Sequence, residues 1–281
     1  MAGWTVLLHG GAKDIRPEDQ ESNRKGCSAA LSAGRVALTR NKSAEEAAEA
    51  IIRVLEDDPI FNAGTGSVSR YGKVSMDASM MEGRSLNVGA VTGLEDVPNP
   101  ITVAAKLLQD KPTLLCGPAA QRYALESGCA IGKIRLQPET VSGVDTVGCI
   151  VQDRSGHFVV ASSTGGLSSR VIGAVGDSPL PGCGFYADDM VGAVACSGDG
   201  EQITRTLLAG RVIHGLEEGR PVDQVLRSAL SQIHRVKGEA GIISVTKAGA
   251  WAWTHNSSHF VIGYASEADP AGLVKLQKKQ S

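Results

Sequence analysis

The alternation of short β-type runs with longer helical runs most restricts how this 281-residue chain can fold. Residues 5–8 are apolar and β-branched and precede Gly10-Gly11, which predicts a buried strand ended by a turn. Helical spacing of Ala and Leu follows over residues 18–39 and 43–55, and Ser43 with Glu46 forms a capping-box pattern at the second start. Two helices are therefore expected directly after the first strand.

Later segments continue the same order of strands and helices. Strands are predicted near residues 73–76, 88–92, 146–152, 157–163, 191–196, 241–246, 250–254 and 260–264. Helices are predicted near residues 101–108, 119–126, 201–218 and 222–236. Helix pairs flanking sheets built from both halves predict an α/β fold, a four-layer αββα sandwich formed by residues 1–281 as one domain.

Composition and charge exclude several function classes. Hydrophobic residues make up 42% and charged residues 21%, enough to fill a large core and to cover it. The net charge is −2 and Lys and Arg are scattered, so nucleic acid is not an expected partner. There is neither an apolar window of membrane-spanning length nor a basic leader, so we expect a cytoplasmic protein without a membrane partner.

A polar segment without clear periodicity, residues 132–144, leads directly into Asp145-Thr146. A threonine at the start of a strand ordinarily has only a structural role, because its hydroxyl is a weak nucleophile unless a base lies beside it. Cleavage before Thr146 would create an α-amino group beside its own Oγ, with an ordinary pKa of about 7.7–8.0. One residue would then contain both a nucleophile and a base suited to neutral pH.

Three further turns carry polar groups, although each alone also fits an ordinary turn. Thr164, just before Gly165-Gly166, could hold the hydroxyl of a nucleophile by a hydrogen bond. The turn at residues 197–200 is glycine-rich, but no Lys-Ser/Thr follows its glycines, which favours an oxyanion hole over a nucleotide site. Asp177, if it faces a cleft, could pair with the ammonium group of an amino acid.

Taken together and in order, these motifs resemble the plant-type asparaginase and isoaspartyl peptidase family of N-terminal-nucleophile hydrolases over nearly the whole chain. The resemblance is carried by His9-Gly10-Gly11, Leu55-Glu56-Asp57-Asp58-Pro59, Phe61-Asn62-Ala63-Gly64, Met76-Asp77-Ala78-Ser79, Asp145-Thr146-Val147-Gly148, Ser163-Thr164-Gly165-Gly166, Val175-Gly176-Asp177-Ser178-Pro179, Tyr186-Ala187-Asp188 and Ser197-Gly198-Asp199-Gly200-Glu201. It implies the N-terminal-nucleophile type of sandwich and self-cleavage into residues 1–145 and 146–281. It also implies hydrolysis of L-asparagine and β-aspartyl dipeptides to L-aspartate, by a dimer of cleaved units, (αβ)2.

The resemblance assigns roles to individual residues. Thr146 would be the nucleophile, Thr164 its support, and Ser197 with Gly198 the oxyanion hole. Substrate contacts would come from Asn62, Gly176, Asp177, Asp199 and Gly200, with Asp177 binding the ammonium group. No cofactor is implied for catalysis, but a structural sodium ion is, bound by the backbone carbonyls of Leu55, Glu56, Asp58, Phe61, Ala63 and Thr65.

Three features differ from the plant-type pattern. The connection before Thr146 is short, and Asp145 stands where that branch has Gly, as in glycosylasparaginase or the threonine aspartase that acts on proteins. Ala174 stands where the family has an Arg that clamps the substrate α-carboxylate, a contact that Ala cannot replace, although Arg170 lies four residues upstream. The alternatives are therefore a glycosylasparaginase- or threonine-aspartase-like hydrolase, or a weakly active pseudoenzyme that binds amino acids.

Overall fold

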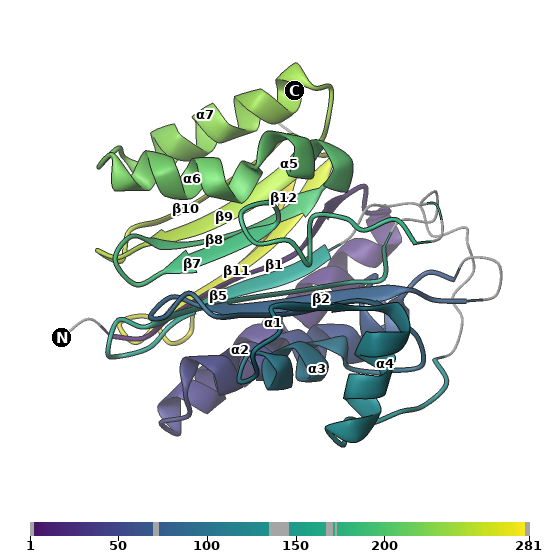
Figure 1. Ribbon diagram of the computed structural model, residues 1–281. Coiled ribbons are helices and arrows are strands. Elements are labelled where there is room, and N and C mark those ends of the chain that lie inside the picture. Colours follow the sequence, from purple (N-terminus) through teal and green to yellow (C-terminus); the bar gives the residue numbers. More distant parts are fainter. Residues whose placement is uncertain (1–2, 70–72, 135–145, 167–170, 172, 279–281) are drawn as a thin grey trace.

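The computed structural model of this chain describes residues 3–69, 73–134, 146–166, 171 and 173–278. Figure 1 shows four layers: helices α1–α4, a large sheet, a smaller sheet and helices α5–α7. This arrangement confirms the predicted αββα sandwich. Among the described residues, no helix is both long enough and apolar enough to cross a membrane.

The larger sheet contains eight strands in the described part of the chain, in the order β12-β11-β1-β5-β6-β2-β3-β4. Their bounds are β1 Thr5–Lys13, β2 Met76–Glu82, β3 Val88–Leu94, β4 Leu114–Cys116, β5 Thr146–Gln152, β6 Phe158–Thr164, β11 His259–Ser266 and β12 Leu273–Lys278. The β3–β4 pair is parallel and the other pairs are antiparallel. The β5 strand, which begins at Thr146, lies between β1 and β6 in the middle of the sheet.

The smaller sheet has the order β10-β9-β8-β7, and all its pairs are antiparallel. Its strands are β7 Phe185–Asp188, β8 Gly192–Gly198, β9 Ala240–Thr246 and β10 Trp251–His255. The glycine-rich turn at residues 197–200, which was singled out in the sequence, begins with the last two residues of β8. It therefore leads from this sheet into the helices that cover it.

Each sheet is covered by helices on its outer face. The larger sheet carries α1 Gln20–Thr39, α2 Ala44–Asp57, α3 Pro100–Leu107 and α4 Gly117–Glu126, and the smaller sheet carries α5 Gly200–Thr206, α6 Leu208–Glu217 and α7 Val222–Arg235. The predicted capping box is present: the Glu46 backbone N–H donates to Ser43 Oγ at 3.2 Å, and the Ser43 N–H donates to Glu46 Oε2 at 3.0 Å. These bonds satisfy backbone groups at the start of α2.

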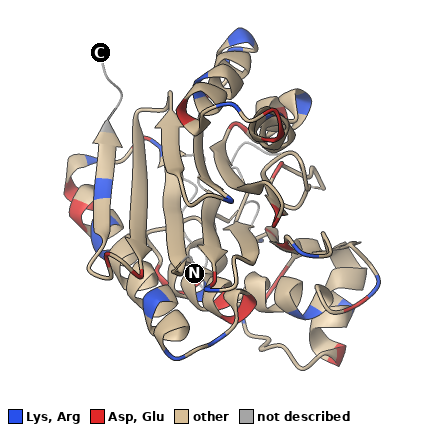
Figure 2. Ribbon diagram, turned by 90° about the vertical axis from the view of Figure 1, so that its left-hand side faces the viewer, with Lys and Arg blue, Asp and Glu red and all other residues tan. Residues whose placement is uncertain are grey.

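Three apolar cores join the four layers, and strand alternation divides the side chains among them. In β5, Val147, Cys149 and Val151 pack toward α1–α4, whereas Ile150 packs between the two sheets. In β8, Val194 and Cys196 pack toward α6 and α7. Figure 2 shows the charged residues mainly on the outer helices and loops, with few on the strands.

Several boundaries differ from the sequence prediction. The first strand does not end at Gly10-Gly11 but continues to Lys13, because a register shift between His9 and Ala12 accommodates the glycines and pairing with β11 then resumes. The helix predicted over residues 201–218 is two helices, broken at Leu207 with φ of +50°. The strand predicted near residues 73–76 runs instead from Met76 to Glu82, as β2, and the strands β4, β7 and β12 were not predicted.

Candidate active site

Thr146 is the first residue of β5 and is buried, with 4% of its surface exposed. Thr164, the last residue of β6, lies directly opposite it in the antiparallel pair, and Asp77 of β2 lies opposite Thr164. The fold therefore brings the predicted nucleophile and its predicted support to the same end of the larger sheet. Both strand assignments follow from β-branched runs that were visible in the sequence.

Two serine hydroxyls contact Thr146. Its Oγ1 lies 3.2 Å from Ser178 Oγ, and its backbone N–H donates to Ser197 Oγ at 3.4 Å. Ser197 Oγ also accepts the Ala12 backbone N–H at 3.0 Å, so a residue of β8 connects β5 with β1. The nitrogen of Thr146 that faces Ser197 is the atom that cleavage would convert into the α-amine.

Sequence reasoning did not single out Ser178 as a site residue, although its motif was noted. Its carbonyl accepts the Ser79 Oγ–H of β2 at 2.6 Å, and in the same turn the Leu180 N–H donates to the Asp177 carbonyl at 3.0 Å. These bonds fold the turn against the larger sheet. The sequence signal was only its position next to Asp177, because nothing local shows that this turn packs on β2.

Gly148, the last residue of the Asp-Thr-Val-Gly motif, lies directly against the imidazole of His9. A Cβ on Gly148 would lie only 2.4 Å from His9 Nε2, so no side chain fits there without displacing the imidazole. His9 is fully buried, and burial lowers its pKa to about 3, despite a counteracting hydrogen-bond contribution from the Thr146 backbone. The ring next to the start of β5 is therefore neutral at physiological pH.

The loop after β6 is held by Asn62, a predicted substrate contact. Asn62 Nδ2 donates to the Gly166 carbonyl at 2.6 Å, and Asn62 Oδ1 accepts the Val68 N–H at 2.9 Å. Thr164 Oγ1 accepts the Gly166 N–H at 3.1 Å. These bonds show Asn62 bracing the backbone beside Thr164, while its substrate contact stays a prediction.

Asp177, the predicted ammonium ligand, is buried with 3% of its surface exposed, and Gly176 precedes it. Two glycines make room for its carboxylate: Cβ atoms on Gly184 and Gly200 would lie 2.8 and 2.9 Å from its oxygens. The predicted role of Gly200 in holding the substrate is compatible with this position. A side chain there would press on the carboxylate.

The turn at the end of β8 has a conformation that favours glycine. Gly198 has φ of +147°, and a Cβ there would lie 2.2 Å from the Glu239 carbonyl oxygen. Asp199, a predicted substrate contact, uses Oδ2 to accept the Glu239 N–H at 2.8 Å. This bond holds the turn that contains the predicted oxyanion hole of Ser197 and Gly198.

The segment predicted to bind sodium, residues 55–65, forms a compact loop at the end of α2. Several of its carbonyls already accept one internal hydrogen bond: Asp58 from the Phe61 N–H at 3.2 Å, Phe61 from the Ala63 N–H at 2.9 Å, and Glu56 from Thr65 Oγ1 at 2.8 Å. Leu55 is buried in the last turn of α2. A carbonyl oxygen has two lone pairs, so these bonds leave room for a cation contact.

The Glu56 side chain has a role that the sequence did not reveal. Its Oε1 accepts the Ser163 Oγ–H at 2.6 Å and the Ile101 N–H at 3.0 Å. The side chain is fully buried, and burial raises its pKa to about 8. Glu56 therefore joins α2 to α3 and to the residue before Thr164 as a largely neutral acid at pH 7.

Two residues named by the sequence prediction, Asp145 and Arg170, lie outside the described residues. Ala174 is described and exposed, and its N–H donates to the Val171 carbonyl at 2.9 Å. Val171 and Val175 are exposed by 73% and 46%. The position that carries the family's Arg is therefore at the protein surface.

The opposite end of the same strands contains a histidine among carboxylates. His157, 5% exposed, places Nδ1 2.9 Å from Asp189 Oδ2, Nε2 3.1 Å from Glu45 Oε1, and Nε2 4.0 Å from Glu82 Oε2. Hydrogen bonding to Glu45, and then to Asp189, raises the His157 pKa to about 9, and the His157 bond lowers the Glu45 pKa to about 2. His157 and Glu45 are therefore both charged at neutral pH.

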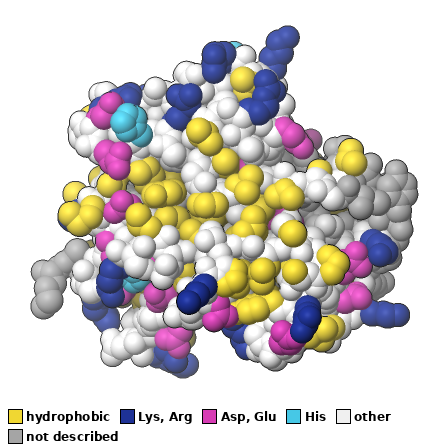
Figure 3. Space-filling view, viewed as in Figure 1, with side chains coloured by type: hydrophobic (Ala, Val, Ile, Leu, Met, Phe, Trp, Pro, Cys, Tyr) yellow, Lys and Arg dark blue, Asp and Glu magenta, His cyan; other side chains and the backbone are white. Residues whose placement is uncertain are grey.

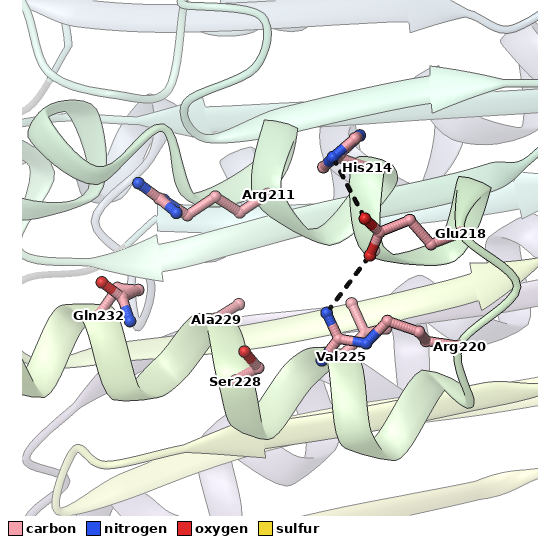
Figure 4. A pocket seen from close by; sticks show the side chains of 9 residues that line it. Arg211, His214, Glu218, Arg220, Val225, Ser228, Ala229 and Gln232 are labelled. Atoms are coloured by element: carbon pink, nitrogen blue, oxygen red, sulfur yellow. Dashed lines mark ion pairs between the residues drawn. The ribbon is translucent and has the colours of Figure 1, made fainter.

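A separate hollow of about 130 Å³ lies between α6 and α7, on the outer side of the smaller sheet (Figure 4). Its lining includes Arg211, His214, Glu218, Arg220 and Gln232. Glu218 pairs with His214 at 3.6 Å and with Arg220 at 3.7 Å. Arg211 Nε instead donates to the Thr206 carbonyl at 2.7 Å. The smaller sheet separates this hollow from Thr146.

Comparison with known proteins places the chain among enzymes of one kind. The profile of the family described as Asparaginase matches residues 2–135 and 131–273. The isoaspartyl peptidase/L-asparaginases of Bos taurus and Homo sapiens are each 36% identical over 278 residues, covering 90% of this chain and 90% of each relative. The probable isoaspartyl peptidase/L-asparaginase 2 of Arabidopsis thaliana is 33% identical over 321 residues, covering 95% of this chain and 97% of its own. The chain thus belongs to the asparaginase family.

Proposed function

We propose that this chain is a self-processing amidohydrolase that hydrolyses L-asparagine and β-aspartyl dipeptides and releases L-aspartate. The observation that carries the proposal is the placement of Thr146 at the start of β5, with its Oγ1 beside Ser178 and its nitrogen beside Ser197. Relatives that align over 90% of the chain are named for both activities. The two stretches matched by the family profile overlap at residues 131–135, shortly before the proposed cleavage site.

Cleavage between Asp145 and Thr146 frees the α-amine that then serves as the base. The Thr146 Oγ proton passes to this amine, and Oγ forms a bond to the β-carbonyl carbon of the substrate. Collapse of the tetrahedral intermediate breaks the C–N bond, and the departing ammonia or amine takes the proton. Water, activated by the same amine, hydrolyses the ester, releases L-aspartate and restores Thr146.

The remaining predicted residues fit this chemistry. Ser197 and Gly198 would stabilise the oxyanion, in a turn that the Asp199–Glu239 bond holds in place. Buried Asp177 would bind the substrate ammonium group, with Asn62, Gly176, Asp199 and Gly200 completing the pocket. The α-carboxylate would lack an Arg partner at residue 174, which predicts weaker binding than in relatives that have one.

A structural sodium ion fits the loop after α2. The backbone carbonyls of Leu55, Glu56, Asp58, Phe61, Ala63 and Thr65 would hold it. These donors are all oxygens, as a hard cation requires, and the neutral Glu56 carboxyl is already used by Ser163 and Ile101. The ion would stabilise the segment from Leu55 to Thr65, which contains Asn62, and no cofactor is proposed for catalysis.

We further propose that the enzyme is cytoplasmic and acts as an (αβ)2 dimer, as the family resemblance implies. Figure 3 shows hydrophobic side chains gathered over the sheets, between the two helical layers. Exposed hydrophobic residues at strand edges and turns include Leu86, Leu114 and Met190. Such a surface favours association with a second copy, and the net charge of −2 does not favour nucleic acid.

The test is ammonia or amine release from L-asparagine and β-aspartyl dipeptides, with L-glutamine and α-aspartyl dipeptides as controls. We expect activity on the first two only, from wild type and not from Thr146→Ala. A panel that also contains a glycosylated asparagine and an aspartate-containing protein substrate tests the alternatives suggested by Asp145. Exclusive turnover of either of these, or binding of asparagine without turnover, would contradict the proposal.

A further inference from the structure

Ser178 is in contact with the atom that the proposed mechanism uses as the nucleophile. Its Oγ lies 3.2 Å from Thr146 Oγ1, and the residue is buried with 2% of its surface exposed. A serine hydroxyl donates one hydrogen bond and can rotate to aim it. The contact is therefore able to respond to a change of charge on the threonine oxygen.

The surrounding structure holds Ser178 in this position. The hydroxyl of fully buried Ser79 donates to its carbonyl at 2.6 Å, and Ser79 belongs to β2, two strands away from β5 in the larger sheet. On its other side is Asp177, whose carboxylate is packed against Gly184 and Gly200. A rigid turn therefore carries the proposed ammonium ligand and this hydroxyl next to each other.

We propose that Ser178 is a catalytic residue, whose hydroxyl donates a hydrogen bond to Thr146 Oγ1 as this oxygen loses its proton and attacks the substrate. The inference rests on the proposed function. The threonine proton goes to the α-amine, Oγ bonds to the carbonyl carbon, and no bond to Ser178 forms or breaks. A hydrogen bond that strengthens as charge develops lowers the barrier more than it tightens substrate binding.

The two neighbouring residues of the turn should therefore affect different kinetic constants. Loss of Asp177 would weaken binding of the substrate ammonium and raise KM. Loss of the Ser178 hydroxyl would lower kcat with KM changed little, because the contact is to the nucleophile. A hydrogen bond to a charged group corresponds to a fall of about ten- to hundredfold in kcat.

The experiment compares Ser178→Ala and Ser178→Cys with wild type, using kcat per mole of chain that mass spectrometry shows to be cleaved. Counting cleaved chains separates slow self-processing from slow hydrolysis. Ser178→Cys keeps nearly the same shape but has a weaker donor, so it remains informative if the Ala variant does not fold. Ser244→Ala is the matched control, since this buried hydroxyl in β9 donates only to the Ala193 carbonyl among the described bonds, at 2.9 Å.

We expect a ten- to hundredfold lower kcat for Ser178→Ala, a smaller decrease for Ser178→Cys, and wild-type kcat for Ser244→Ala. Wild-type kcat in cleaved Ser178→Ala or Ser178→Cys overturns the inference. A change confined to KM also overturns it, and so does an equal fall in kcat in Ser244→Ala. Failure of wild type to hydrolyse the β-aspartyl substrates would instead refute the proposed function.

Discussion

The two ends of strands β2, β5 and β6 differ in how they use polar side chains. At one end, Thr146 is surrounded by the hydroxyls of Ser178 and Ser197 and by the neutral ring of His9. At the other end, His157 is bonded to the carboxylates of Glu45 and Asp189. The same strands therefore have uncharged hydroxyl and imidazole groups around Thr146 at one end and the charged His157–Glu45 pair at the other.

The difference follows from what each end connects. The His157 cluster joins the start of α2, the start of β6 and the turn between β7 and β8, and so links three of the four layers. At the other end, the hydroxyl and the nitrogen of Thr146 must remain able to exchange a proton. Stability and catalysis should consequently be separable by substitutions at opposite ends of the sheet.

The largest expected effect comes from removing the nucleophile. Thr146→Ala should lower kcat/KM for β-aspartyl substrates by roughly 10⁴-fold or more, because the covalent route is lost. Thr146→Ser is the matched control and should retain measurable activity. If Thr146→Ala kept a tenth of the wild-type kcat/KM, Thr146 would not be the nucleophile and the catalytic site would lie elsewhere.

Activity should increase when an Arg is introduced at residue 174, where the family pattern has one. Ala174→Arg should raise kcat/KM for β-aspartyl substrates by about ten- to hundredfold, because a charge-assisted bond to the α-carboxylate would be added. Residue 174 is exposed, so the longer side chain should not lower Tm. A substrate whose α-carboxylate is blocked as an amide is the control. If kcat/KM for the blocked substrate rises equally, the introduced Arg does not bind the α-carboxylate.

At the opposite end, His157→Gln should reduce stability and leave kcat unchanged. Removing one member of a buried ion pair lowers the free energy of unfolding by about 3–5 kcal/mol. Because the Glu45 side chain is 29% exposed, the loss in His157→Gln should be about 3 kcal/mol or less. The expected decrease in Tm is roughly 5 °C. Calorimetry and steady-state kinetics on the same preparation check both statements. A large fall in kcat at unchanged Tm would remove the distinction between the two ends.

The stabilising effect of the cluster should also depend on pH. The His157 pKa is raised to about 9, so its contribution is complete below the ordinary histidine pKa of 6.5 and is lost as pH rises through about 9. The Glu45 pKa is lowered to about 2, so its contribution is present above 4.5 and is lost as pH falls toward 2. The difference in Tm between wild type and His157→Gln should shrink from pH 6 to pH 9.5. A constant difference would mean that His157 acts through packing.

Much of the fold was predictable because strands and helices have local signals. The β5 strand matches its predicted bounds, and the α2 cap is formed by the predicted residues. Short edge strands such as β4, and the break at Leu207, depend on tertiary packing and gave no local signal. Gly10-Gly11 was interpreted as a turn that ends the first strand, because a bulge and a strand end have the same glycine pattern.

The candidate site was less accessible to sequence reasoning. Thr146 and Asp177 were identified by motifs, but the contacts of Ser178 and Glu56 join segments that are 32 and 107 residues apart. Such contacts depend on sheet order and register, which one sequence does not specify. The role of His157 has the same origin, because Glu45 and Asp189 become its neighbours only in the assembled layers.

Activation by self-cleavage before Thr146 is tested most directly by the mass and the N-terminal sequences of the purified chain. Wild type should yield two fragments, residues 1–145 and 146–281, the second beginning with Thr146, while Thr146→Ala should keep the full mass. Hydrolytic activity should rise in step with the cleaved fraction. A fully active wild type with the Asp145–Thr146 bond intact, or a Thr146→Ala chain cut at the same bond, would contradict it.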